Sequence, residues 1–493
     1  MTTPALAISQ NEIQRLIVTL LIGVTFLVAF GLLVARSTES LIAYVSITMF
    51  AILPAALWIW NGTRGIPILA AMASFHYIYY AIPVLRHELI LTTYAPSEIA
   101  RAGLTTALYL IAATIAWALL LWGKPRRLRI DSQENRAGRG YELLVFLGLG
   151  CGIIYYFALF SGLLSALGPL VGLVRSVMLT ATSLACFMLG HSRAQGNLRG
   201  TNWALAVGCL GVIVASALAT LFLISAVIYC MAAVFGFVIT RKRVPWKFMS
   251  AITVVIIVLH AGKSEMREKQ WLANFGAEMP ITQIPGFLME WGATGLTKIA
   301  SGQVFSNAID RASLMQLLLH VQRLSPDRIP YLYGEAYAQL PNMLVPRFIN
   351  PEKQVSQYAM SMLNIRYGLQ TQEETLKTAV GWGLLAESFA NFGYLGVIGV
   401  GFLLGLVSAF FERASAGAEV ISLRTLSAIA VLLQFINLEA DATAAISSLA
   451  QSLVAVAVFF GLFRMVSKRQ AHSLQRDRRS VIPTRITPDA ASG

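Results

Sequence analysis

The chain has 493 residues, of which 56% are hydrophobic and 13% are charged. A soluble globular domain carries about 25% charged residues, so this composition excludes an ordinary soluble enzyme and indicates an integral membrane protein. The net charge of +14 could indicate nucleic-acid binding, but no aromatic-basic module accompanies it, and much of the excess lies in short loops beside apolar stretches.

Apolar stretches near 20 residues recur along the chain, and a helix needs about 20 residues to cross the hydrocarbon core. Backbone groups in lipid must be hydrogen-bonded within the segment, so each stretch is predicted to be a helix. We predict about twelve spans, at residues 13–35, 41–60, 66–85, 103–122, 143–162, 167–189, 203–219, 221–239, 247–263, 383–411, 422–437 and 446–466. The first is too long for the apolar region of a cleavable signal peptide. The tenth is predicted to begin as a broken or re-entrant piece, because Gly381, Gly383 and Gly393 interrupt it.

Short basic loops mark the cytoplasmic side of a membrane protein. Three loops are assigned to that side: 123–142, 190–202 and 240–246. The basic tail, 467–493, comes out on the same side by alternation, which supports the assignment. Alternation of the spans then places both termini in the cytoplasm. It leaves three loops on the far side: 86–102, 263–380 and 438–445.

These features predict an all-α fold, a polytopic bundle of about twelve transmembrane helices with one large, partly helical loop on the far side. Four parts follow along the chain. They are 1–262 with nine spans, 263–380 as the loop domain, 381–466 with the last three spans, and 467–493 as a basic tail that we expect to be disordered.

Several short motifs follow one another in the loop and at the start of the next span. They are "PYLYGEAY", with Gly334 to Tyr337, then Pro346-Arg347, Pro351-Glu352-Lys353, Arg366-Tyr367-Gly368 and Asn391-Phe392-Gly393. In this order they resemble the bacterial O-antigen polymerases, also called oligosaccharide repeat-unit polymerases. The resemblance covers about 120 residues, and the remaining spans match that family in architecture.

The resemblance implies a metal-independent glycosyltransferase without a cofactor, at the periplasmic face of the bacterial inner membrane. Such an enzyme transfers a glycan from undecaprenyl pyrophosphate to the end sugar of a second lipid-linked repeat unit. The product would be the O-antigen of lipopolysaccharide or an exopolysaccharide. A chain-length regulator and a flippase are the protein partners that the family suggests, and nucleic acid is not one.

Three cations lie close together in the loop sequence: Arg347, Lys353 and Arg366. A departing pyrophosphate develops negative charge, and the planar fork of arginine donates two hydrogen bonds to phosphate oxygens. Cations fixed where charge develops are a large catalytic contribution. We therefore predict that these residues hold the pyrophosphate, and ordinary salt bridges with Glu352 or Glu373 are the structural alternative.

An acceptor hydroxyl needs a general base, and a carboxylate can supply it. Glu335 lies in the turn-like "YGEAY", and Glu387 lies four residues before Asn391, on the same helix face. Either carboxylate is a candidate base. The structural alternative for Glu387 is a hydrogen bond to a neighbouring helix.

Further substrate-binding candidates are Arg175, Arg267, Arg311, Tyr333, Tyr367 and Asn391. Arg175 lies inside the sixth span near its outer end, where an arginine faces a wet cavity or extends its charged end to the interface. Exposed tyrosines can stack on sugars or anchor the chain at the membrane interface.

The remaining polar residues point to no second chemistry. Cys151, Cys186, Cys209 and Cys230 lie in apolar stretches and are predicted to form no disulfide. His76 is predicted to be a satisfied residue of the bundle interior. Glu439 and Asp441 are predicted to be solvated charges in the last outer loop.

Two other functions share the architecture. An O-antigen ligase would transfer glycan to a lipid A core and would favour a loop histidine, for which His320 is the only candidate. A transporter or flippase of lipid-linked oligosaccharides would change no covalent bond, and it usually shows internal repeats, which this sequence lacks. The sugar, the linkage and the stereochemical outcome do not follow from the sequence.

Overall fold

The computed structural model describes residues 10–86, 89–121, 139–241, 243–273, 279–301, 313–345, 349–350 and 358–480. Every regular element within these ranges is a helix, and eleven helical segments are long and apolar enough to cross a membrane. The protein is therefore a multi-pass membrane protein with an all-α fold, which confirms the predicted class.

The first nine spans are α1 (Gln10–Val34), α2 (Thr38–Trp60), α3 with η1 and α4 (Ile68–His76, Tyr77–Ala81, Ile82–Arg86), α5 (Pro96–Leu121), α6 (Arg139–Phe160), α7 (Val171–Gln195), α8 (Gly200–Ala219), α9 (Leu223–Arg241) and α10 (Trp246–Arg267). The loop region holds α11 (Ile284–Ala300), α13 (Leu314–Leu324), η6 (Glu335–Tyr337), α14 (Leu340–Leu344), α15 (Tyr358–Arg366) and α16 (Gln372–Lys377). The last three helices are α17 (Gly383–Ser415), α18 (Leu423–Phe435) and α19 (Ala442–Ser480).

The observed spans differ from the predicted ones mainly at their ends. Helix α5 already begins at Pro96, and α7 begins at Val171 because the 3₁₀ segment Leu163–Leu170 precedes it. Helix α18 has only 13 residues, fewer than the about 20 that a full crossing needs. The tail prediction was wrong for residues 467–480, because α19 continues as a helix through Ser480.

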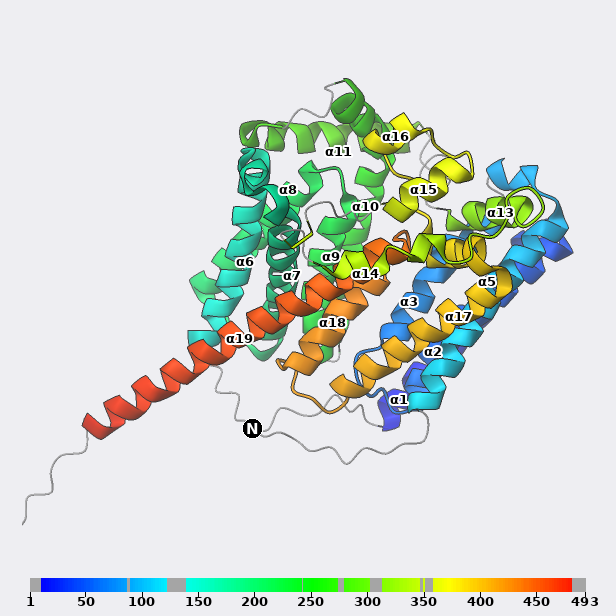
Figure 1. Ribbon diagram of the computed structural model, residues 1–493. Coiled ribbons are helices and arrows are strands. Elements are labelled where there is room, and N and C mark those ends of the chain that lie inside the picture. Colours follow the sequence, from blue (N-terminus) through cyan, green and yellow to red (C-terminus); the bar gives the residue numbers. More distant parts are fainter. Residues whose placement is uncertain are drawn as a thin grey trace, which may run out of the picture.

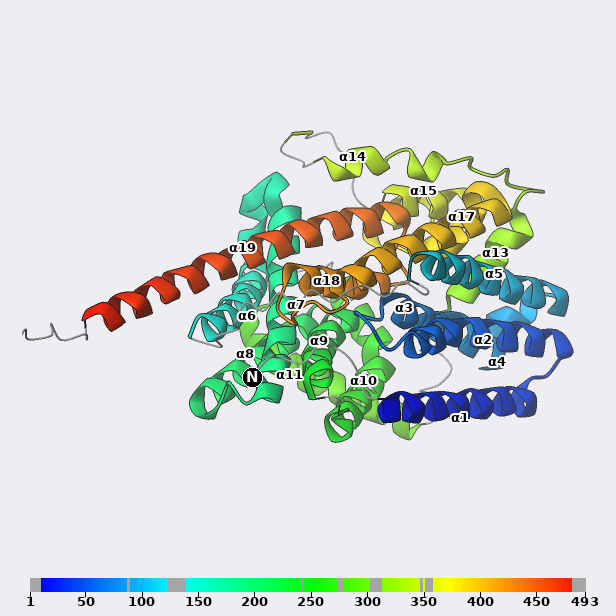
Figure 2. The same ribbon diagram turned by 90° about the horizontal axis from the view of Figure 1, so that it is seen from below.

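The helices form two groups that α18 joins (Figures 1 and 2). One group contains α1 to α5, α13 and α17, and residues such as Tyr109 and Leu318 form its core. The other contains α6 to α9 and much of α19, around Leu184 and Phe187. Helix α18 contacts α3 and α17 on one side and α7 and α19 on the other, so it connects the two cores.

Glycines set a close helix crossing between α5 and α17. A Cβ atom at Gly401 would lie 2.5 Å from the carbonyl oxygen of Tyr109, and one at Gly405 would lie 2.0 Å from that of Ala113. Gly401 and Gly405 are four residues apart, so both lie on one face of α17. Small residues let two membrane helices approach closely, so the backbones of α17 and α5 are in direct contact at these glycines.

The end of the bundle that carries α13 to α16 and residues 436–441 is called the loop face. Arg323 of α13 binds Glu98 at the start of α5 with two bonds, Nε–Oε1 of 2.9 Å and Nη2–Oε2 of 2.7 Å. Its guanidinium also lies 3.9 Å from the centre of the Tyr94 ring, and Glu98 raises the pKa of Arg323. These contacts of Arg323 with Glu98 and Tyr94 hold α13 of the loop region against the start of α5.

The opposite end brings together the start of α3 and the ends of α5 and α17. Glu412 accepts hydrogen bonds from the Leu69 amide at 3.0 Å and from Trp117 Nε1 at 2.6 Å. Asn61 Nδ2 reaches the carbonyl oxygen of Leu121 at 3.5 Å. The loop after α2, the start of α3 and the ends of α5 and α17 therefore lie at one end of the bundle. Which side faces the cytoplasm remains a prediction.

Replacing Gly405 with alanine should destabilise the bundle, because the new Cβ atom would overlap the Ala113 carbonyl and force α5 and α17 apart. Overpacking of this kind costs about 1–3 kcal/mol. The measurement is the thermal midpoint of the detergent-solubilised protein, followed by fluorescence-detected size exclusion.

Gly399→Ala is the matched control, because no atom lies within 4 Å of a Cβ atom at that position of the same helix. Equal midpoints for the two variants would contradict the tight crossing.

Candidate functional site

Helix α17 is broken near its start, and the break organises the candidate site. Phe392 has φ −140° and ψ 18°, and Gly393 has φ 58° and ψ −140°, so neither is helical. The break separates a short limb, residues 383–391, from a long limb that crosses the bundle. It confirms the predicted interruption at Gly393, although Gly383 lies at the first position of the helix and not inside it.

The loop segment 331–334 supplies hydrogen-bond donors to the broken turn. The amide of Leu332 donates to the Ala390 carbonyl at 3.0 Å, and the amide of Tyr333 donates to the Asn391 carbonyl at 3.0 Å. A helix end leaves its last carbonyls without intrahelical partners, and in a membrane protein they must be satisfied elsewhere. The "YLYG" motif therefore completes the end of the short limb.

The conformation of Gly393 explains why glycine stands at the break. Its positive φ is strained for residues with a side chain, and a Cβ atom would lie 2.8 Å from the hydroxyl oxygen of Tyr331. The conformation and the close approach of Tyr331 both require glycine. The motif "NFG" is thus a structural element of the break.

Arg366 and Glu335 form an ion pair on the loop face. Nη1 of Arg366 lies 2.5 Å from Oε2 of Glu335, and their side chains are 34% and 53% exposed. Arg366 occupies the last turn of α15, where a cation interacts favourably with the helix dipole, and Glu335 begins η6. The structure thus joins two predicted site residues that are 31 positions apart.

Asn391 and Glu387 lie beneath this surface, on the short limb of α17. Asn391 donates from Nδ2 to the Glu387 carbonyl at 2.9 Å and accepts from the Gly334 amide at 3.2 Å. The predicted common face of the two residues is confirmed. Asn391 therefore links the short limb to the turn that precedes Glu335.

Glu387 is completely buried, and only one of its carboxyl oxygens is bonded. Oε2 accepts from the Ala442 amide at 2.7 Å, at the first residue of α19. Oε1 has no hydrogen-bond partner among the described residues, and neither does the buried hydroxyl of nearby Tyr337. The hydrogen bond to a neighbouring helix, which was the structural alternative, is therefore present.

Asp441 corrects the sequence prediction, because it is buried and not solvated. Oδ1 accepts from the Ala444 amide at 2.6 Å and from the Thr443 hydroxyl at 2.8 Å, which caps the start of α19. Oδ2 accepts from the Met360 amide at 3.0 Å, in the first turn of α15. Burial raises the pKa of Asp441. One carboxyl group thus caps a membrane helix and the loop helix that carries Arg366.

The two candidate tyrosines have different roles. Tyr333 is 75% exposed and has a positive φ of 47°, an uncommon conformation for a residue with a large side chain. Tyr367 is buried, and its hydroxyl hydrogen-bonds with that of Ser325 at 2.7 Å while its ring packs edge-on against Trp382. The Tyr333 ring therefore lies at the surface, whereas Tyr367 packs the loop region.

Arg175 and Arg267 lie in other parts of the bundle. Arg175 is exposed in the second turn of α7, close to Tyr155 and Tyr156 of α6. Arg267 ends α10 and donates to the Leu221 carbonyl at 3.1 Å. Neither packs into the core beneath the Glu335–Arg366 pair. Arg175 and Arg267 were predicted to bind substrate, and the geometry gives no support to a substrate site that they share with Arg366.

Three further predicted residues lie outside the described part of the chain: Arg311, Arg347 and Lys353. The Pro-Arg and Pro-Glu-Lys motifs lie there as well. Their place relative to Arg366 stays a prediction.

No protein-family model, curated protein or solved structure significantly matches this chain. The functional argument therefore rests on the site itself and on the motif resemblance.

The sequence analysis did not identify Glu412 as a structural residue, and it assigned Asp441 to the solvated surface. Glu412 lies one residue after the tenth predicted span, 383–411, and inside the observed helix α17, and its oxygens bind the start of α3 and Trp117. An acidic residue within a membrane span is costly unless it is partnered, so its position was itself a signal. For Asp441 the signal was weaker: an Asp directly before an apolar helix is a common N-cap.

Replacing Asp441 with alanine should loosen α15 and α19 together, because both helices lose a capping acceptor. A lost helix cap costs about 0.5–2 kcal/mol. The measurement is the thermal midpoint in detergent combined with the rate of limited proteolysis within the loop region. Asp327→Ala, an exposed acidic residue of the same region, is the control and should behave as wild type.

The contribution of Asp441 to the stability of the folded protein should depend on pH. Because burial raises the pKa of Asp441 above 3.8, the folded state holds this proton more tightly than the unfolded chain. The stabilisation from this group is greatest below the unfolded pKa and is lost as the pH rises through the folded pKa. The stability advantage of wild type over Asp441→Asn should therefore be larger in mildly acidic buffer than at neutral pH. An advantage independent of pH would contradict this assignment.

Proposed function

We propose that this protein polymerises undecaprenyl-pyrophosphate-linked oligosaccharide repeat units at the periplasmic face of a bacterial inner membrane. The observation that carries the proposal is the exposed Glu335–Arg366 pair, held beside the broken start of α17 with the exposed Tyr333 nearby in the same segment. Cation, carboxylate and aromatic ring are the three groups that a sugar linked to a pyrophosphate would require.

Arg366 is the pyrophosphate-binding residue in this proposal. Its guanidinium is one-third exposed and already engaged with a carboxylate, so it can exchange that partner for phosphate oxygens of similar geometry. A cation carried by the helix that Asp441 caps would stabilise the charge that develops on the leaving pyrophosphate. Arg347 and Lys353, six residues apart, are proposed to contribute to the same site.

Glu335 is favoured over Glu387 as the general base. When Arg366 turns to the pyrophosphate, the Glu335 carboxylate becomes free to accept a proton on the loop face. Glu387 is completely buried below it and bonded to the start of α19, so it does not meet a sugar in this arrangement. We propose that Glu387 and Asn391 support the turn that presents Glu335.

The proposed reaction forms one bond and breaks one. The hydroxyl oxygen of the acceptor sugar bonds to the anomeric carbon of the donor, while the bond from that carbon to the pyrophosphate oxygen breaks. The hydroxyl proton passes to the carboxylate, and the electron pair leaves with the pyrophosphate. Tyr333 would stack on a sugar ring during this step.

His320 weakens the ligase alternative. Its Nε2 lies 2.9 Å from the carbonyl oxygen of Tyr367, which can only accept, so this nitrogen donates a structural hydrogen bond. The ring is half-buried in α13 and not presented to a ligand on the loop face.

Deleting the gene in its own host should replace long surface polysaccharide chains by single capped repeat units. The measurement is the chain-length distribution of the surface polysaccharide on a gel. Chains of unchanged length that fail to reach the lipid A core would instead indicate a ligase. Loss of all surface repeat units would indicate transport.

Arg366→Ala, reintroduced into the deletion strain, should lower chain growth by roughly ten-fold or more, because a charge-assisted hydrogen bond contributes about 1.5–3 kcal/mol. Arg366→Lys should recover part of the activity, since a point charge replaces the two-pronged donor. Arg328→Ala, an exposed arginine of the same region, is the control and should support full chain length. Normal chains in the Arg366→Ala strain would remove this residue from the site.

A further inference from the structure

Helix α11 lies across the neighbouring membrane helices, at the same end of the molecule as α16 (Figure 1). With 17 residues it is shorter than the about 20 that a crossing helix needs. One face of α11 packs against the last turns of α10 and the turn between α8 and α9, through Ile284, Phe287 and Trp291, which are at most 8% exposed. Nε1 of Trp291 also donates to the Leu259 carbonyl at 2.7 Å. Helix α11 is therefore packed onto the bundle and does not cross the membrane.

Glycines bring α11 and α10 into backbone contact. A Cβ atom at Gly295 would lie 2.0 Å from the Val258 carbonyl oxygen, and one at Gly262 would lie 3.0 Å from the Gly295 amide nitrogen. Val258 lies nine residues before Arg267, the last residue of α10, which corresponds to about 13 Å along the helix axis. This crossing fixes the depth of α11 relative to the end of the span.

A second face of α11 is apolar and exposed. Pro285, Met289, Ala293 and Leu296 are all exposed, with Met289 at 72% and Leu296 at 57%. These residues recur at intervals of three or four positions, so they form one stripe along the helix. The stripe is called the apolar face of α11. A continuous exposed apolar surface of this kind marks contact with a partner or with lipid.

The remaining face of α11 is polar and is directed toward the end of α10. Lys298 Nζ lies 3.0 Å from Oε2 of Glu265, and Glu290 pairs with Lys269, just beyond α10. Both α10-side partners follow the crossing at Val258 in the direction of the end of the span. Lys298 and Met289 are nine positions apart, which is two and a half helical turns, so they lie on opposite sides of α11. The apolar face is therefore directed back toward the middle of the span.

The outer surface of α10 continues the apolar face. Val254, Val255 and Ile257 are 59%, 52% and 46% exposed, and they lie directly before Val258, where α11 crosses. Exposed apolar side chains in the body of a membrane span face lipid, because the surrounding hydrocarbon solvates them. Since the apolar face of α11 borders this surface, the acyl chains that cover α10 also reach α11. This continuity favours lipid over a protein partner.

We infer that α11 lies in the membrane interface, with its apolar face in the acyl chains of the adjoining leaflet and its polar face among the headgroups. Amphipathic helices that lie in this plane bury their apolar side about 5–10 Å into the boundary between headgroups and acyl chains. In this arrangement the lipid leaflet holds part of the predicted loop domain, 263–380. The inference is independent of the proposed polymerase activity.

Collisions of a spin label with oxygen and with a nickel chelate test this placement without an activity assay. The four native cysteines are replaced by alanine, and single cysteines are introduced at Leu296 and at its neighbour Thr297, which is exposed beside the polar face. A nitroxide is attached to each cysteine, and the full-length protein is reconstituted into bilayers. Oxygen concentrates in the hydrocarbon, whereas nickel ethylenediaminediacetate stays in water. Cysteine-free protein treated with the same label gives the background.

Two reference positions calibrate the measurement. Val255→Cys places a label on the exposed surface of α10 and represents hydrocarbon. Glu373→Cys places one on exposed α16 and represents water. The ratio of oxygen to nickel collision rates at 296 should lie between these references and should exceed the ratio at 297 several-fold. If Leu296→Cys does not fold, Met289→Cys on the same face gives the same comparison with Thr297→Cys.

Two outcomes would overturn the inference. Nickel collisions at 289 and 296 as frequent as at the Glu373→Cys reference would place the apolar face in water. Few collisions with either reagent at both positions would mean that protein covers this face, as in a complex with a partner or a second copy of the chain.

Discussion

The break in α17 is the constraint on which the arrangement of the loop face depends. Ending a helix inside or beside a membrane exposes carbonyl groups, and these must find donors because lipid offers none. Here the backbone amides of residues 331–334 supply these donors. If the loop moved away from the bundle, the carbonyl groups of Ala390 and Asn391 would lose their hydrogen bonds. The same contact fixes the turn that presents Glu335, which in turn holds Arg366.

Carboxylates at helix starts extend this anchoring through the bundle. Glu387 and Asp441 bind the first turn of α19, Asp441 also binds α15, and Glu412 binds the start of α3. Buried carboxyl groups are costly in a membrane, and backbone amides at a helix N-terminus are among the few partners that offset the cost. Glu387 and Glu412 therefore have structural roles within α17. The burial of such a carboxyl group does not by itself make it a catalytic base.

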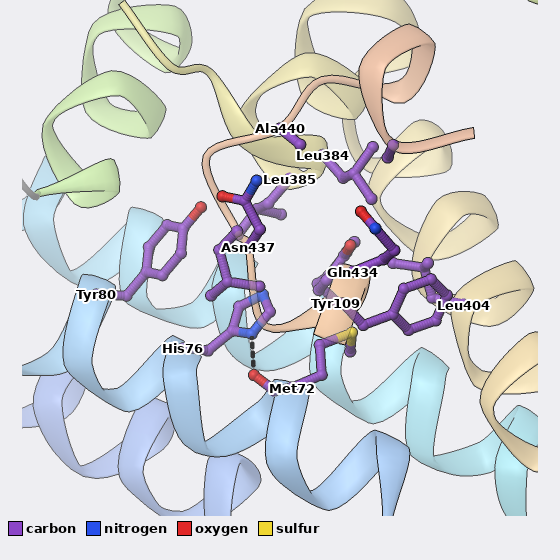
Figure 3. Close-up of a pocket in the computed structure, with 13 residues that line it drawn as sticks. Met72, His76, Tyr80, Tyr109, Leu384, Leu385, Leu404, Gln434, Asn437 and Ala440 are labelled. Carbon is purple, nitrogen blue, oxygen red and sulfur yellow. Dashed lines mark hydrogen bonds between the residues drawn. The ribbon is translucent and has the colours of Figure 1, made fainter. Parts of the chain in front are cut away.

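The exposed Glu335–Arg366 pair and a small, mostly apolar cavity lined by His76, Tyr80 and Tyr109 (Figure 3) lie at different depths in the protein. Glu335, Arg366 and Tyr333 lie at the surface of the loop face. His76, Tyr80 and Tyr109 lie in a space that holds only a few small molecules. The short limb of α17 borders both, because Asn391 supports the surface turn while Leu384 and Leu385 line the cavity.

Hydropathy and length were sufficient to determine the all-α class and most of the spans, because a crossing helix needs an uninterrupted apolar stretch whatever its neighbours are. Alternation of the spans also placed loops 86–102, 263–380 and 438–445 on one side, where Arg323 contacts Glu98 and Met360 contacts Asp441. Glycine in the tenth span predicted a break, and the four-residue spacing placed Glu387 beside Asn391. These are local properties of the chain.

Only the tertiary structure decided which polar residues meet. The pairing of Glu335 with Arg366, the burial of Asp441 and the separation of Arg175 and Arg267 from that pair all depend on contacts between distant segments. Sequence spacing does not set the position of such segments, because helix packing and the loop closure over α17 determine it. From the sequence alone, a charged residue in a polar loop, such as Asp441, is predicted to be solvated. Its burial becomes evident only when the structure shows which helix it caps.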